Sequence, residues 1–189
     1  MLKIKRDIAT ECLALASNYP VVTVLGPRQS GKTTLVRSLF ASKPYVNLEL
    51  PDIRAMAQAD PVTFIKQYET GAIFDEIQRV PELLSYLQVL VDDLEFNHKP
   101  YKGLFILTGS HQLELHAAIA QSLAGRNAIL NLFPLSIREL SKAGMDYALD
   151  EYILNGFYPR IYKDKLNPLR NYRNYVQTYL EKDVRKIIN

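Results

Sequence analysis

The chain has 189 residues, of which 48% are hydrophobic and 23% are charged. This composition is ordinary for a globular protein, so it excludes an intrinsically disordered chain and a fibrous repeat. A net charge of +3 is too small to indicate nucleic acid as a partner. The single cysteine, Cys12, excludes an internal disulfide and a cysteine-based zinc site, and no apolar run approaches the roughly 18 residues of a membrane span. These features predict a soluble, cytoplasmic protein that does not enter a membrane.

The first two thirds of the chain alternate short apolar runs with helical patterns. Residues 21–25 form an almost wholly apolar, β-branched run that is typical of a buried parallel strand. Asp60 before Pro61 is typical of a helix N-cap followed by proline at the first helical position. The expected helices span 5–18, 32–41, 52–59, 60–68, 81–94 and 113–123, and the expected strands span 21–25, 45–48, 72–74, 104–107 and 128–133.

Strands that alternate with helices indicate an α/β fold with right-handed crossovers and a parallel sheet covered by helices on both faces. After Pro134 the strand pattern stops, and the chain has a helical pattern to its end. We therefore expect an N-terminal helix packed on the core over 1–18, an α/β core over 19–134, and a helical appendage over 135–189.

Residues 26–33, Gly-Pro-Arg-Gln-Ser-Gly-Lys-Thr, match the phosphate-binding loop pattern in full. Glycines let such a loop wrap closely, so that successive backbone N–H groups point at the phosphates, and the helix that begins near Lys32 adds the positive end of its dipole. Lys32 is expected to bridge the β- and γ-phosphates of a nucleotide, and Thr33 to ligate Mg²⁺. A chance glycine-rich turn is the alternative, but the strand before the loop and the helix after it argue against one. The candidate nucleotide-binding residues are Gly26, Pro27, Arg28, Gln29, Ser30, Gly31, Lys32, Thr33 and Thr34.

Asp75 and Glu76 follow the apolar run at 72–74. In open parallel sheets, ligands bind beyond the carboxyl ends of the strands, where both side chains would lie. Asp75 is expected to hold Mg²⁺ through water, and Glu76 to polarise the attacking water as a general base. The alternative is that the two acids cap the following segment, but their pairing with the phosphate-binding loop favours the catalytic role.

Two further positions complete the candidate catalytic set. Ser110 ends the run Thr108-Gly109-Ser110 after the fourth strand, where a polar side chain can sense the γ-phosphate; a turn or a helix N-cap is the alternative. Arg126 precedes the fifth strand and is expected to project from the flank of a subunit, so that it can reach the γ-phosphate of a neighbour. This role requires a homo-oligomer, and a solvated surface charge is the alternative.

With these motifs in order, the chain resembles AAA+-type P-loop ATPases, and more narrowly a prokaryotic family of largely unassigned role. The segments that carry the resemblance are GPRQSGKTTL (26–35), IFDEIQRVPELL (73–84), FILTGSHQLEL (105–115), QSLAGRNAILNLFPLSIREL (121–140), GFYPRIY (156–162) and YVQTYLEKDVR (175–185). The resemblance implies a five-stranded sheet of order 5-1-4-3-2, a C-terminal helical lid, and ATP and Mg²⁺ as ligands. It supports the roles given above to Lys32, Thr33, Asp75, Glu76, Ser110 and Arg126.

The resemblance also bears on the lid and on the extent of the chain. Arg160 lies in the expected lid, where such proteins often place a second arginine near the nucleotide; a salt bridge or a solvated charge is the alternative. For Arg28, inside the loop, a solvent-facing position is the favoured alternative to a phosphate contact. Members of the family usually continue into a C-terminal, nuclease-like domain, so we expect this chain to be the N-terminal ATPase part of a longer protein; a naturally short protein is the alternative.

The tail over 160–189 is rich in tyrosine and carries eight basic and three acidic side chains. Such a segment can bind a nucleic-acid strand by charge and stacking. The tyrosines at 172, 175 and 179, however, follow the spacing of a buried helix face. Packing against another domain or subunit is therefore the preferred interpretation.

Together the motifs predict Mg-dependent ATP binding and hydrolysis by a module whose conformational change does mechanical or switching work. A nucleotide-gated switch with little turnover, whose output lies in the missing domain, is the second hypothesis. A small-molecule kinase is the third. The expected position of residues 108–110 between the loop and the acidic pair argues against a kinase, as does the lack of an arginine-rich acceptor lid.

Overall fold

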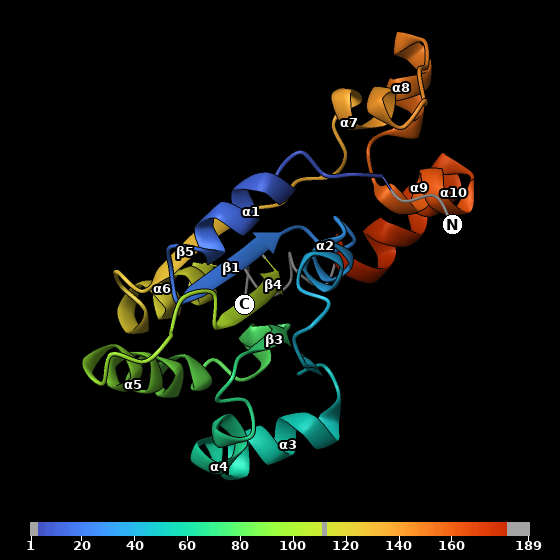
Figure 1. The fold of residues 1–189 in the computed structure, drawn as a ribbon. Coiled ribbons are helices and arrows are strands. Elements are labelled where there is room, and N and C mark those ends of the chain that lie inside the picture. The colour runs from blue at the N-terminus through green and yellow to red at the C-terminus, as the bar shows by residue number, and fades with distance from the viewer. Residues whose placement is uncertain (1–3, 111–112, 181–189) are drawn as a thin grey trace. The chain divides into compact units, whose positions relative to one another are not determined.

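The computed structural model describes residues 4–110 and 113–180 of the chain (Figure 1). Its contacts form two compact units. The first, here called the sheet unit, comprises Ile8–Pro27 and Lys32–Leu132, and the second, the helical unit, comprises Met1–Asp7, Arg28–Gly31 and Phe133–Asn189 as far as they are described. The domain bounds expected from the sequence stay predictions, and their last nine residues lie outside the described part.

Five parallel strands make up the sheet, and they follow the spatial order β2-β3-β4-β1-β5. This order confirms the predicted one. In register, Gly26 at the end of β1 pairs with Ser110 at the end of β4, and Phe74 pairs with Leu107. The carboxyl ends of β1, β3 and β4 therefore meet at one edge of the sheet. The strands are β1 (Val21–Gly26), β2 (Tyr45–Asn47), β3 (Ala72–Asp75), β4 (Phe105–Ser110) and β5 (Asn127–Asn131).

Alternate residues of the central strands enter two separate apolar cores, because successive side chains of a strand point to opposite faces. Ile73 and Ile106 belong to one core, with Leu35 of α2, whereas Phe74 and Leu107 belong to the other. Both faces of the sheet are thus covered by helices, as predicted. The helices of the sheet unit are α1 (Ala9–Ala16), α2 (Lys32–Leu39), α3 (Pro51–Ala59), α4 (Pro61–Lys66), α5 (Leu83–Phe96) and α6 (Leu113–Ser122), with a 3-10 turn at Ile77–Arg79.

Local chemistry explains where several elements begin and end. The Asp60 side chain accepts a 3.0 Å hydrogen bond from the Thr63 amide, and Pro61 is the first helical residue of α4, so the predicted cap is confirmed. The first helix is shorter than the expected 5–18 at both ends, because it begins at Ala9 and ends at Ala16. The fourth strand is longer than expected and extends to Ser110.

Short helices make up the helical unit, which confirms the helical pattern expected after Pro134. Its own apolar core contains Leu140, Tyr152 and Tyr162, and Ile4 of the N-terminal segment packs against it. The helices are α7 (Ile137–Lys142), α8 (Leu149–Asn155), α9 (Pro159–Asp164) and α10 (Pro168–Tyr175), followed by a π-helical turn at Val176–Leu180.

The tyrosine stripe of the tail packs within the helical unit. The rings of Tyr172 and Tyr175 lie 6.0 and 5.0 Å from that of Tyr158 at the start of α9. Both side chains are half-buried, whereas that of Tyr179 lies outside the described part. None of the helices in residues 4–110 and 113–180 has the length and hydrophobicity of a membrane span.

Candidate functional site

The phosphate-binding loop connects β1 to α2 through two residues in the left-handed backbone region, Gln29 (φ 63°) and Gly31 (φ 97°). Lys32 opens α2, and its side chain is only 5% exposed. Its ammonium donates hydrogen bonds of 2.9 and 3.0 Å to the carbonyl oxygens of Gly26 and Pro27. Two carbonyl groups of the loop thus hold the ammonium. Phosphate oxygens can replace them at little cost, because carbonyl and phosphate oxygens both accept hydrogen bonds from the three N–H groups of the ammonium.

Several buried polar atoms of the candidate site have no protein partner in the described part of the chain. They include Ser30 Oγ and Gln29 Oε1 in the loop, and Ser110 Oγ at the end of β4. Ser30 and Ser110 are 0% and 6% exposed. A buried polar group without a partner costs about 1–3 kcal/mol, so such atoms are typical of places where a ligand or water completes the hydrogen bonding. The unpartnered atoms of Gln29 and Ser30 fit a polar ligand at the loop.

The buried carboxylate of Asp75 accepts hydrogen bonds from three hydroxyl groups. Thr33 Oγ1 lies 3.0 and 2.9 Å from its two oxygens, and Tyr45 donates a 2.6 Å hydrogen bond to Oδ2. Thr108 donates a hydrogen bond to Oδ1. Carboxylate and hydroxyl oxygens are the ligands that Mg²⁺ prefers, so Thr33 and Asp75 together fit a magnesium site.

Glu76 lies next to this carboxylate with a left-handed backbone, at φ 61°. Such a conformation costs a non-glycine residue about 1–3 kcal/mol and is concentrated at functional sites. Its backbone N–H donates a 3.2 Å hydrogen bond to Thr108 Oγ1. Its carboxylate accepts a hydrogen bond from the side-chain amide of Gln78. Gln78 therefore holds the expected general base.

Ser110 lies beside the start of the phosphate-binding loop, because it pairs in register with Gly26. The residue before it, Gly109, leaves room for two neighbouring side chains, which a larger residue would have to displace. A Cβ atom on Gly109 would lie 2.4 Å from Leu115 Cδ2 and 2.9 Å from Gln78 Oε1. The close approach brings the Gln78 amide next to the end of β4, where the γ-phosphate sensor is expected.

Both predicted arginines outside the loop form ion pairs within their own unit. Arg126 binds Asp92 of α5 through Nε and Nη2, the latter at 2.9 Å, and also donates to the Ala124 carbonyl. Arg160 lies 3.2 Å from Asp164 one turn along α9, and its side chain is 61% exposed. The sequence analysis expects Arg126 to project from the flank of a subunit, whereas here its side chain is bound to Asp92. The roles of the two arginines at a nucleotide stay predictions. Of the remaining loop candidates, Pro27 and Arg28 are half-buried and Thr34 is exposed.

Comparison with known families decides the class of the protein. The family model of the AAA domain matches residues 18–141, a segment that holds the phosphate-binding loop, Asp75, Glu76 and Ser110. The chain belongs to the AAA domain family. A second model, of a domain of unknown function, matches residues 146–189 of this AAA protein.

Two curated relatives of this AAA protein are 31% identical to it over 190 residues: "Uncharacterized protein Rv2008c" of Mycobacterium tuberculosis and "Uncharacterized protein Mb2031c" of Mycobacterium bovis. The similarity covers 99% of this chain and 41% of each relative. The chain thus spans about two fifths of the length of these relatives.

Solved structures share the fold of the AAA domain at low sequence identity. The Walker-type ATPase PABY2304 of Pyrococcus abyssi superimposes with a TM-score of 0.61 at 14% identity, over 98% of this chain and 75% of that one. AMPPCP-bound DnaA of Aquifex aeolicus gives 0.51 at 14% identity, over 95% of this chain and 63% of that one. The chain therefore has the fold of a nucleotide-binding P-loop ATPase module.

Two residues of this AAA domain that reach the site were missed by sequence reasoning. Tyr45 lies on the short edge strand β2, with the Arg37 guanidinium 4.4 Å from the centre of its ring. Burial and the hydrogen bond to Asp75 raise the pKa of the Tyr45 hydroxyl well above its usual range, so this group stays a donor. Gln78 follows Glu76 in a 3-10 turn. Tyr45 lies outside the quoted motifs, and Gln78 lies inside the segment 73–84 without a role assigned to it there. Only the place of each beside the carboxylates reveals it.

Proposed function

We propose that this AAA domain binds ATP at the phosphate-binding loop and hydrolyses it with Mg²⁺. The observation that supports this best is the contact between Thr33 and Asp75, because it joins the first turn after the loop to the end of β3. Binding and hydrolysis need these two parts together: a cradle for the phosphates and a carboxylate that positions the metal.

Each residue has a role in this proposal that its position supports. The Lys32 ammonium exchanges the loop carbonyls of Gly26 and Pro27 for oxygens of the β- and γ-phosphates. Thr33 and Asp75 would hold Mg²⁺, which neutralises phosphate charge when bound. Ser110, whose hydroxyl has no protein partner among the described residues, donates to the γ-phosphate or to the attacking water.

Glu76 takes the proton of the attacking water. The water oxygen forms a bond to the γ-phosphorus while the bond from that phosphorus to the bridging oxygen of ADP breaks, and one proton passes to the carboxylate. The products are ADP and inorganic phosphate. Because the Gln78 amide holds the carboxylate, Glu76 must release or share that hydrogen bond to act as the base.

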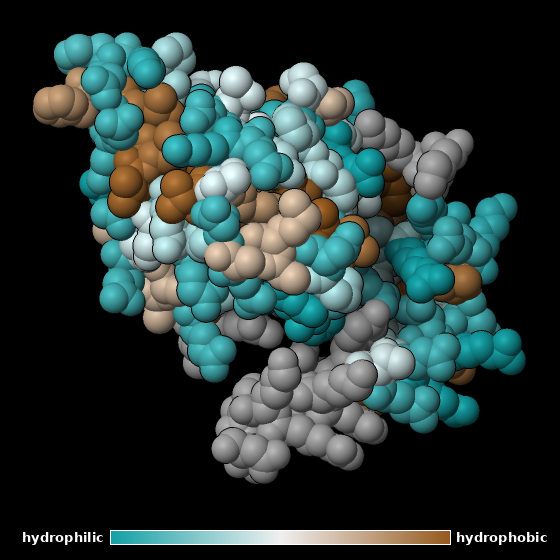
Figure 2. Space-filling view, turned by 90° about the horizontal axis from the view of Figure 1, so that it is seen from below, coloured by the Kyte–Doolittle hydropathy of each residue, from teal (hydrophilic) through white to brown (hydrophobic). Residues whose placement is uncertain are grey.

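The flank that carries Arg126 fits contact with a second copy of the chain. Asp92, which binds the arginine, shares one face of α5 with Val89 and Phe96 at helical spacing. These two apolar side chains are 68% and 84% exposed, and apolar side chains also gather on the face shown in Figure 2. An exposed apolar stripe is typical of an interaction surface. We propose that a homo-oligomer covers it and that Arg126 then reaches the neighbour's nucleotide.

A nucleotide-gated switch with little turnover is the second candidate. Two observations favour it: Gln78 holds the general base, and Asp92 holds the arginine that would act on a neighbour. Because the chain spans 41% of its curated relatives, the output of such a switch would lie in the rest of a longer protein.

The two candidates are separated by measuring ATP turnover and ATP binding against protein concentration at fixed Mg²⁺. The wild-type chain is compared with Glu76→Gln, which keeps the size of the side chain, and with Lys32→Ala, which removes the phosphate contact. A rate per subunit that rises with concentration and is lost in Glu76→Gln, with binding retained, supports hydrolysis. Tight binding without turnover at any concentration supports the switch. Binding that Lys32→Ala leaves unchanged contradicts both.

A further inference from the structure

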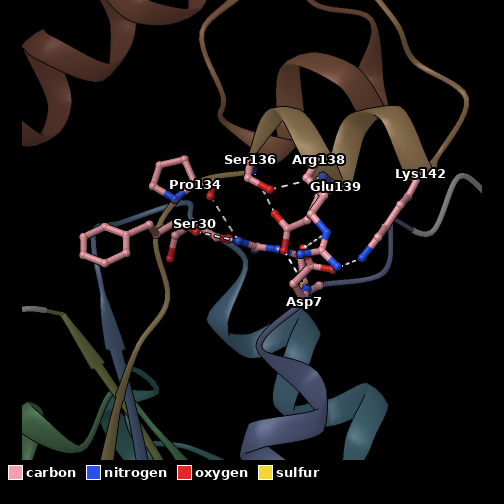
Figure 3. A network of polar contacts seen from close by, with 9 residues as sticks. Asp7, Ser30, Pro134, Ser136, Arg138, Glu139 and Lys142 are labelled. Carbon is pink, nitrogen blue, oxygen red and sulfur yellow. Dashed lines mark hydrogen bonds and ion pairs between the residues drawn. The ribbon is translucent and has the colours of Figure 1, made fainter.

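Arg6, in the segment before α1, donates hydrogen bonds to four residues of the helical unit and is the hub of this network. Figure 3 shows its partners Ser30, Pro134 and Glu139 close together. Its Nη1 donates a 2.8 Å hydrogen bond to the carbonyl oxygen of Ser30 in the phosphate-binding loop. Its Nη2 donates to the carbonyl oxygens of Phe133 and Pro134, at 2.6 and 3.1 Å, and its Nε lies 3.0 Å from a carboxylate oxygen of Glu139. One guanidinium thus joins the loop to the start of the C-terminal helices.

The Arg6 guanidinium is held in a single orientation, because the Glu139 carboxylate that binds it is itself fixed. Glu139 is buried, and it accepts hydrogen bonds from the amides of Asp7 and Ser136 as well as from Arg6. It also closes the capping box of α7 with Ser136. A buried charge pair whose remaining positions are hydrogen-bonded tolerates little movement. The Arg6 guanidinium therefore presents Nη1 to the loop in a defined direction.

The contact with Ser30 determines which way the next amide of the loop points. The Ser30 carbonyl and the Gly31 N–H belong to one planar, trans peptide unit, in which the two groups point in opposite directions. Because Arg6 holds the carbonyl, the Gly31 N–H is turned away from the guanidinium. Gly31 itself lies against Arg6, since a Cβ added there would be 3.6 Å from Nη1.

We infer that Arg6 is a positioning residue for nucleotide binding: it orients the peptide between Ser30 and Gly31 so that the N–H is available to a phosphate oxygen. This inference rests on the proposed binding of ATP at the loop. A planar guanidinium is needed, because it donates in several fixed directions at once, whereas a lysine ammonium on a flexible chain does not hold that geometry. The contact of Arg6 with the loop is to a backbone carbonyl, so the role we assign to it is an effect on affinity.

The test is a titration of the chain with Mg-ATP that yields both the dissociation constant and the binding stoichiometry. In Arg6→Ala we expect the dissociation constant to rise at least tenfold at an unchanged stoichiometry of one, and in Arg6→Lys to rise at least threefold. The matched control is Arg138→Ala, because Arg138 joins the same network through Asp7 at 3.5 Å and its side chain is 76% exposed. The control should bind within twofold of wild type.

A purely structural role has a different signature. If Arg6 only stabilised the fold, the variants would bind with lower stoichiometry and an unchanged dissociation constant, and that result would overturn the inference. Should Arg6→Ala fail to fold, Arg6→Lys decides alone, and failure of both to fold also contradicts a positioning role. The proposed function is judged separately by wild type and Lys32→Ala. If the wild-type chain does not bind Mg-ATP, both proposals fail; if Lys32→Ala loses binding and the Arg6 variants keep it, only this inference is wrong.

Discussion

The hydroxyl of Thr33 lies 2.9 Å from a carboxylate oxygen of Asp75, although 42 positions separate the two residues in the chain. The contact exists because parallel pairing brings the ends of β1, β4 and β3 to one edge of the sheet, and α2 begins at that edge. Tyr45 and Thr108 complete the hydrogen bonding of the same carboxylate. The candidate magnesium ligands are therefore positioned by the sheet.

The hydrogen bond from Tyr45 to Asp75 should contribute measurably to stability. Tyr45→Phe removes one donor from a buried carboxylate, so we expect the free energy of unfolding to fall by about 1–3 kcal/mol. Urea unfolding measures this. The matched control is Tyr101→Phe, because the Tyr101 hydroxyl donates a hydrogen bond of 3.0 Å to Glu95 at the surface. Its loss should change stability by less than about 0.5 kcal/mol. Equal effects of the two substitutions would contradict the special role of Tyr45.

Arg126→Ala should abolish turnover if this arginine acts on a neighbouring subunit, with a loss of about a thousandfold or more. Its ion pair with Asp92 is partly exposed, so stability should change by less than about 1 kcal/mol. Asp92→Ala breaks the same ion pair but keeps the arginine, and its turnover should stay within a few-fold of wild type. Steady-state ATPase assays over a range of protein concentrations test both. Equal losses in the two variants would show that the ion pair matters and the arginine does not reach a neighbour's nucleotide.

Two glycines of the helical unit should respond differently to alanine. Both have a positive φ, 73° at Gly144 and 61° at Gly156, where ψ is −157°, a combination essentially restricted to glycine. A Cβ atom meets nothing within 4 Å at Gly144 and lies 1.8 Å from the Tyr172 hydroxyl at Gly156. That hydroxyl is bonded to the Asn155 carbonyl at 3.0 Å and cannot move freely. Gly144→Ala should cost about 1–2 kcal/mol for the backbone alone, and Gly156→Ala about 1–3 kcal/mol more.

Chemical denaturation measures both free energies. Adding Tyr172→Phe to Gly156→Ala should recover part of the loss, since it removes the atom that clashes. If Gly156→Ala costs no more than Gly144→Ala, the close approach of Tyr172 is not maintained in solution.

Cys12 should react slowly with thiol reagents in the folded protein. Its side chain is fully buried on the inner face of α1, and burial raises its pKa to about 11. At pH 8 only about one molecule in a thousand would carry the reactive thiolate. The Cys12 thiol therefore reacts only after α1 detaches from the sheet or the protein unfolds. Labelling with a chromogenic disulfide, with and without urea, checks this. Fast labelling without urea at pH 8 would show that α1 leaves the sheet readily.

The phosphate-binding loop and the acidic pair could be predicted, because each is formed by consecutive residues of the chain. A phosphate-binding loop needs eight consecutive positions, and an apolar strand that ends in Asp75 and Glu76 needs five. The strand-and-helix alternation then placed these motifs at the carboxyl edge of a parallel sheet, which the structure confirms. The order of the strands came from the resemblance of the whole set of motifs to a known family.

Other contacts could not be predicted from the sequence, since each depends on register and on side-chain direction. Tyr45 reaches Asp75 because β2 pairs with β3, and Gln78 turns back to Glu76 because a 3-10 turn follows the left-handed residue. Arg126, expected to project, instead binds Asp92 of α5. None of these pairs has a characteristic spacing.

The sequence alone determined that the chain is an α/β protein with a phosphate-binding loop and two acidic residues at a strand end, because local patterns of apolar, glycine and charged residues carry that information. Only the tertiary structure decided which side chains hold those residues in place. Arg6 and Ser30 show this most clearly: 24 positions apart, they share one hydrogen bond, and a long-range contact of this kind arises from packing that no local pattern encodes.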